Sequence, residues 1–141
     1  MNRIQLAQNL YLDEYIPKDM YTQYEGREHI LIGLLDKRLI MADQWLRDHF
    51  GPMTINNWYL GGERQWSGLR IVGSPQYSPT SQHSFGRASD KIFKEVTAEE
   101  VREFIRINHS IGMITCIEKN VSWVHSDVRQ LWNTDFLEVS A

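Results

Sequence analysis

The chain has 141 residues and a formal charge of −3, and 42% of its residues are hydrophobic. This length fits a single domain spanning residues 1–141, with enough apolar side chains for one packed core. The negative charge argues against nucleic acid as a partner, because binding phosphates requires a concentrated basic patch.

A single cysteine, Cys116, leaves no partner for an intramolecular disulfide, so nothing requires an oxidising compartment. The N-terminal sequence MNRIQLAQNLYLDEY lacks the apolar core of a signal peptide. No apolar run approaches the roughly 18–20 residues of a membrane span. We therefore expect a monomer that is made in the cytoplasm and has no membrane or nucleic-acid partner.

The first long element is a predicted helix from Glu28 to Phe50. Gly51 and Pro52 end it, because glycine accepts a positive φ and proline cannot continue a helix. Apolar residues recur within it at spacings of three and four, and therefore form one stripe facing the core. The stripe consists of Leu35, Leu39, Ala42, Leu46 and Phe50.

The stretch after this helix changes character. Residues 53–60, MTINNWYL, predict a short strand. Residues 61–79 are rich in Gly, Ser, Pro, Arg and aromatic residues and have little periodicity. An irregular loop of that length inside a compact domain is uncommon and tends to be functional.

A second helix is predicted to begin at Thr97, because Thr97 and Glu100 match a capping box, and helical spacing continues to about Asn108. The charged residues from Lys91 to Glu100 are expected to be exposed. Next, MITCIE and SWVHSDVR flank a short KNV connection and predict a β-hairpin. This order of elements predicts a small α+β domain, with an antiparallel sheet of about four strands and flanking helices.

The segment SQHSFGRASD, residues 81–90, contains candidate metal ligands. His83 precedes Asp90 by seven positions, and Gly86 lets the chain between them fold back. Zinc binds imidazole nitrogen and carboxylate oxygen, and a catalytic zinc keeps three protein ligands and a fourth position for water. The third ligand is expected from His125 in SWVHSDVR, which places the zinc site on the sheet.

The wider pattern resembles the zinc D-Ala-D-Ala metallopeptidases, which share a fold with the lysostaphin-type endopeptidases and the hedgehog signalling domain. It is most similar to the compact peptidoglycan peptidases of phages and bacteria, over roughly residues 55–132. The pattern is Ser81-x-His83-x-x-Gly86-x-Ala88-x-Asp90 followed by Trp123-Val124-His125-x-Asp127-x-Arg129. The resemblance implies that His83, Asp90 and His125 bind Zn²⁺.

The resemblance also implies roles in substrate binding. Arg70 in Ser67-Gly68-Leu69-Arg70 matches an arginine that faces the substrate and stabilises its oxyanion or carboxylate, although Leu69 replaces the usual aromatic residue. Ser81 matches a serine that lines the substrate cleft. Trp123 is expected to pack beside the metal strand with one edge in the cleft, where it contacts substrate. Arg129 is expected to make either a structural salt bridge or a contact with substrate.

One position departs from the family pattern. Many members have the catalytic base three residues before the last histidine ligand, where this chain has Ser122. A hairpin turning at residues 119–122 would pair Glu118 with Trp123 and Cys116 with His125, and side chains alternate between faces along a strand. The face of His125 would then also carry Glu118, as the catalytic base, and Asp127, which orients a histidine ligand.

The resemblance implies a zinc metallopeptidase of the D-Ala-D-Ala carboxypeptidase or endopeptidase type. It would use zinc-activated water to cleave D-amino-acid-containing stem or cross-link peptides of peptidoglycan, after lysis or phage delivery, or to cleave cytosolic peptides. Ser122 supports an alternative, a catalytically inactive zinc-stabilised binding or phage virion protein. A metal-free α+β domain is the third possibility.

Overall fold

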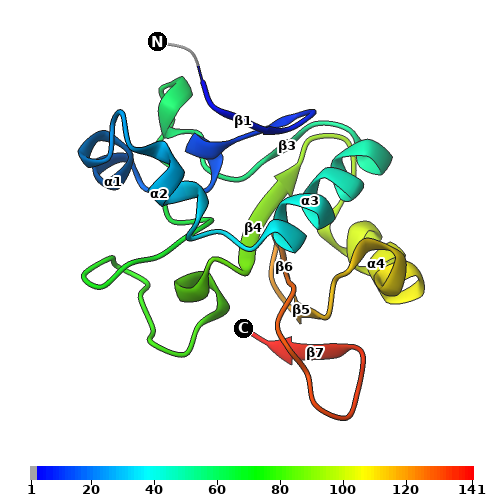
Figure 1. Cartoon of the computed structure of the whole chain (residues 1–141). Helices are drawn as coiled ribbons and strands as arrows, with labels where there is room; N and C mark the ends of the chain where they lie inside the picture. The colour runs from blue at the N-terminus through cyan, green and yellow to red at the C-terminus, as the bar shows by residue number, and fades with distance from the viewer. Residues whose placement is uncertain (1–2) are drawn as a thin grey trace.

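The computed structural model describes residues 3–141 as a small α+β domain (Figure 1). A mixed five-stranded sheet has the order β3-β4-β6-β5-β7, and a separate antiparallel pair is formed by β1 and β2. The strands are β1 (Gln5–Ala7), β2 (Leu10–Tyr11), β3 (Met53–Thr54), β4 (Ala88–Phe93), β5 (Cys116–Lys119), β6 (Val124–Asp127) and β7 (Leu137–Ser140). The α-helices are α1 (Lys18–Gln23), α2 (Glu28–Ile32), α3 (Lys37–Phe50) and α4 (Ala98–Gly112).

The helices α3 and α4 pack together on one face of the sheet (Figure 1). Their buried side chains join those of the strands in the main core, which includes Leu39 and Leu46 of α3 and Ile105 of α4. The central strands β4 and β6 are antiparallel and pair Asp90 with His125. Because side chains alternate across a strand, Asp90 and His125 project from the face opposite the buried side chains of Ser89 and Lys91.

A buried ion pair connects α3 to the sheet. Lys91 Nζ lies 3.1 Å from Asp43 Oδ1, and both side chains are fully buried. The hydroxyl groups of Tyr15 and Ser89 each donate to Asp43 Oδ2 at 2.7 Å. The prediction that Lys91 is exposed was therefore wrong, because Asp43 compensates its charge inside the core.

The helix predicted from Glu28 to Phe50 is divided into α2 and α3. The side chain of Asp36 accepts a hydrogen bond from Arg38 N and caps α3, so the helix restarts there. The backbone N–H of Asp36 donates to Gly86 O at 2.9 Å. The break thus connects the start of α3 to the glycine between His83 and Asp90.

The strand predicted for residues 53–60 is shorter than expected. Only β3 forms, and a 3₁₀ helix follows at Trp58–Leu60. Asn56 and Asn57 interrupt the strand because their side-chain oxygens accept from Ser67 N and Arg64 N in the next segment. That segment, residues 61–80, contains no helix or strand, as the sequence predicted.

The C-terminal half agrees more closely with the elements predicted from the sequence. Thr97 caps α4 with the expected capping box, although the helix continues to Gly112. The predicted hairpin forms from β5 and β6. The sheet is not purely antiparallel, because β7 pairs with β5 in parallel and adds a fifth strand. No helix in residues 3–141 has the length and apolar character needed to cross a bilayer.

Gly86 is predicted to be irreplaceable for packing as well as for backbone conformation. Its φ is +67°, and an added Cβ would lie 1.9 Å from Leu34 O. Gly61 is a matched control, because its φ is +94° and nothing lies within 4 Å of an added Cβ. We expect Gly61→Ala to lower the free energy of unfolding by about 1–2 kcal/mol and Gly86→Ala to lower it further. Equal losses in denaturant unfolding would contradict the close approach.

Candidate metal centre

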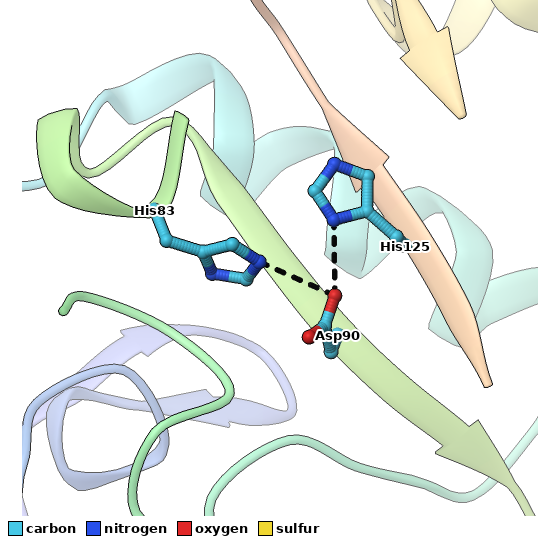
Figure 2. Close-up of side chains that lie close together, drawn as sticks. All are labelled: His83, Asp90 and His125. Carbon is cyan, nitrogen blue, oxygen red and sulfur yellow. Dashed lines mark hydrogen bonds and ion pairs between the residues drawn. The ribbon is translucent and has the colours of Figure 1, made fainter. Parts of the chain in front are cut away.

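Three side chains from separate segments converge on one point of the sheet (Figure 2). Asp90 Oδ1 lies 3.3 Å from His83 Nε2 and 3.0 Å from His125 Nδ1. One ligand atom from each residue lies within 4.8 Å of the other two. The three residues are buried, so the water that would otherwise solvate these groups is largely excluded.

The His83 ring is fixed by the turn that carries it. His83 belongs to a 3₁₀ helix at Gln82–Phe85, whose N-cap Ser81 accepts from His83 N. Its Nδ1 lies 2.8 Å from Gly68 O. Because a carbonyl can only accept, Nδ1 donates to Gly68 O, and Nε2 is the nitrogen that faces Asp90 Oδ1.

The His125 ring is fixed from the opposite direction along its own strand. Its Nε2 lies 2.8 Å from Asp127 Oδ2, which leaves Nδ1 facing Asp90. Arg129 donates to both oxygens of Asp127, at 2.8 Å from Nε and 2.7 Å from Nη2. This arrangement selects Nδ1 of His125 as the nitrogen available to a metal.

Arg70 occupies the other oxygen of Asp90. Its Nη2 donates to Asp90 Oδ2 at 2.9 Å, and its Nε donates to Trp66 O at 2.7 Å. The Asp90 backbone N–H also donates to Ser67 O. The long loop at residues 61–80 therefore holds the Asp90 carboxylate in place through Oδ2 and the backbone N–H. The other oxygen, Oδ1, faces His83 and His125.

Hydrogen bonds and nearby charges favour the charged forms of Asp90, His125 and Asp127 despite their burial. Burial alone would raise the pKa of Asp90, but the hydrogen bonds from His125 and His83 outweigh it and hold the pKa far below its usual range. Burial would lower the pKa of His125, but hydrogen bonds to Asp127 and Asp90 raise it to about 9. Burial opposes ionisation of Asp127 as well, and Arg129 and His125 hold its pKa below the usual value.

The residues fit a divalent metal ion. His83, Asp90 and His125 form the one group found in residues 3–141 whose ligand atoms are close enough to hold one. The donors are two imidazole nitrogens and one carboxylate oxygen, a set that suits zinc and several other transition metals. Each donor is oriented by a further hydrogen bond, as is usual for metal ligands in proteins.

Glu118 lies beside this group, although the predicted hairpin register was wrong. The structure pairs Cys116 with Asp127 instead of His125, a shift of two residues. The turn begins one residue later than expected because Asn120 adopts a positive φ of 65°. A shift of two keeps each side chain on its face, and Glu118 Oε1 lies 3.6 Å from His125 Nδ1.

The metal group lies in a cleft of about 380 Å³. Its lining brings together all the residues predicted to bind metal or substrate, and Glu118: Arg70, Ser81, His83, Asp90, Glu118, Trp123 and His125. Asp127 is fully buried and does not line the cleft, but it contacts His125 Nε2. A cavity of about 590 Å³ elsewhere, against α3, is lined mainly by apolar side chains.

Sequence reasoning missed several features of this region. It did not find Gly68 O as the partner of His83, because a backbone carbonyl has no sequence signal. It considered Arg129 for either a structural salt bridge or substrate, and the structure shows the salt bridge to Asp127. It also did not single out Gln76, Thr80 and Gln82, which line the cleft.

Comparisons with known proteins give no family assignment: no family model matches the chain, and no curated protein or solved structure matches it either.

Asp127→Asn is predicted to weaken metal binding without removing a ligand. The substitution keeps the shape of the side chain but removes the charge that orients His125 and pairs with Arg129. We expect zinc affinity to fall by about 10–100-fold, measured by competition with a chromogenic chelator. Asp135→Asn, at an exposed position outside the cleft, is the control. Equal affinity in the two variants would contradict this role.

Metal affinity is also predicted to depend on pH. The pKa of His125 is about 9 in the metal-free protein, and a metal binds only the neutral imidazole. Apparent zinc affinity should therefore rise with pH up to that pKa, by about tenfold per pH unit. Calorimetry at neutral pH in buffers of different protonation enthalpy should detect about one released proton. A pH-independent affinity between pH 7 and 9 would contradict the assignment.

Proposed function

We propose that the protein is a zinc-dependent peptidase that hydrolyses D-amino-acid-containing peptides of peptidoglycan. The observation that carries the hydrolytic part is a buried three-ligand group in an open cleft with a carboxylate, Glu118, beside it. The peptidoglycan part rests on the resemblance of the ligand pattern to the D-Ala-D-Ala metallopeptidases. The choice of zinc rests on that resemblance and on the donor set.

Zinc, when bound, would lower the pKa of a water molecule toward about 7 and polarise the scissile carbonyl. Glu118 is the proposed general base: it takes a proton from the attacking water and delivers it to the leaving amine. A carbon–oxygen bond forms and the carbon–nitrogen bond breaks, so one water is consumed for each peptide bond. The Glu118 side chain is 24% exposed, which allows it to meet both water and substrate.

Arg70 is proposed to combine two roles. Its Nη2 and Nε hold Asp90 and Trp66 O, which fixes the guanidinium in the wall of the cleft. Nη1 is left for a substrate oxygen, where a positive charge stabilises the negative charge that develops on the carbonyl.

The alternative function, a catalytically inactive zinc-stabilised protein, rests on Ser122 standing where many family members have the catalytic base. The position of Ser122 in the structure weakens this alternative. Ser122 is exposed in the turn before β6 and lies outside the lining of the metal cleft. Even a carboxylate at this position would not face the metal group. The absence of a base there is therefore compatible with a base supplied by Glu118 on the neighbouring strand.

The proposed activity is tested on purified cell walls. The zinc-loaded protein should release free amino groups, and a chelator should stop the release until zinc is restored. Heat-inactivated protein is the control. No chelator-sensitive release from walls or soluble stem peptides would overturn the peptidase assignment.

Glu118→Gln separates catalysis from metal binding. The amide keeps the shape of Glu118 but cannot accept the proton, so we expect the turnover rate to fall by about 100-fold or more. Zinc content should remain at one ion per chain. Glu25→Gln, at an exposed position outside the cleft, should keep full activity. An active Glu118→Gln protein would exclude Glu118 as the base.

A further inference from the structure

Two residues that line the cleft each carry a polar atom with no hydrogen-bond partner. Gln82 Oε1 and Trp123 Nε1 are buried and unpaired within residues 3–141. Both residues line the cleft that contains the metal group. An unpaired buried polar atom costs about 1–3 kcal/mol, and such atoms are rare in folded proteins. Their presence in the same cleft therefore points to a ligand that completes them.

The two atoms have opposite hydrogen-bonding character. Gln82 Oε1 is an acceptor, and the Trp123 indole N–H is a donor only. Every residue of a peptide main chain except proline offers one N–H donor and one C=O acceptor. An extended peptide can therefore satisfy both atoms, whereas a ligand with only acceptors or only donors satisfies one.

The two residues come from different segments of the chain. Gln82 precedes His83 in the 3₁₀ helix, and Trp123 directly precedes β6, which carries His125. In Figure 2 the His83 and His125 rings approach the Asp90 carboxylate from two different directions. A main chain bonded to both segments would therefore run along the cleft that contains Asp90.

The cleft continues beyond Trp123. A second hollow of about 240 Å³ shares Arg70, Gln76, Asp90 and Trp123 with the first. Its far end is formed by the long loop at residues 63–67. Gln82 is not part of this second hollow. A peptide bonded to Gln82 and Trp123 thus has space to continue past the metal group toward Trp66.

We propose that the cleft binds an extended peptide main chain on both sides of the scissile bond. The Trp123 indole N–H donates to a substrate carbonyl, and the Gln82 side-chain carbonyl accepts from a substrate N–H. This inference rests on the proposed peptidase function and makes its substrate an internal peptide segment. The enzyme is then an endopeptidase that recognises the main chain of its substrate. Binding does not require a free carboxylate at the end of the peptide.

Binding is measured separately from cleavage. The zinc-loaded Glu118→Gln protein is titrated by calorimetry with a synthetic stem pentapeptide ending in D-Ala-D-Ala, and with the same peptide acetylated and amidated at its ends. We expect similar affinities for both peptides. A loss of more than about tenfold on amidation would overturn the inference, because a terminal carboxylate would then be recognised. Absence of binding to either peptide would also overturn it.

Trp123→Phe in the same background removes the N–H but keeps an aromatic ring. We expect about tenfold weaker binding of the capped peptide, with unchanged or higher stability because no hydrogen bond is lost. Trp58→Phe is the matched control, since Trp58 Nε1 donates to Ile16 O at 2.9 Å outside the cleft. It should lower stability and leave peptide affinity unchanged.

Gln82→Met tests the acceptor in the same way. Methionine keeps the length of the side chain but removes the amide oxygen, so we expect about tenfold weaker binding of the capped peptide. Gln44→Met is the control, because the Gln44 amide is already bonded to Asn9 and Asp48. Parental affinity in both Trp123→Phe and Gln82→Met would overturn the inference. Peptide binding that depends on these residues, without hydrolysis by the unsubstituted protein, would refute the peptidase alone.

Discussion

The site depends on one shared carboxylate oxygen. Asp90 Oδ1 faces an imidazole nitrogen of His83 on one side and one of His125 on the other. Two nitrogen donors and one oxygen donor around a single point can hold a metal ion, and each donor is already oriented by a second hydrogen bond. Removing Asp90 would leave two buried imidazoles without the charge that brings them together.

The elements that hold this oxygen are distributed along the chain. The long loop supplies Gly68 O for His83 and Arg70 for Asp90, and β6 supplies Asp127 behind His125. On the other side of the sheet, the buried pair of Asp43 and Lys91 joins α3 to β4. The irregular loop thus holds two of the candidate ligands in place and also forms part of the cleft wall.

Features set by neighbouring residues could be predicted from the sequence, whereas the exact pairing and breaks of the elements could not. The capping box at Thr97 is a local signal, and it predicted the start of α4. Side chains alternate along a strand, and this predicted that Glu118, His125 and Asp127 share one face of the sheet. The hairpin register depended on the φ of Asn120, and the break before α3 depended on Asp36, so these details were missed. The parallel strand β7 has only four residues and is mostly exposed, so the alternation of Leu137 and Val139 with polar residues is too short to predict it.

The central claim is that His83, Asp90 and His125 together bind one catalytic metal ion. X-ray absorption spectroscopy at the zinc edge measures this most directly on the zinc-loaded protein in solution. The geometry predicts one zinc per chain with two imidazole ligands and light oxygen or nitrogen donors at about 2.0–2.2 Å, and loss of this spectrum in Asp90→Ala. A sulfur ligand, fewer than two imidazoles, or an unchanged spectrum in Asp90→Ala would contradict it.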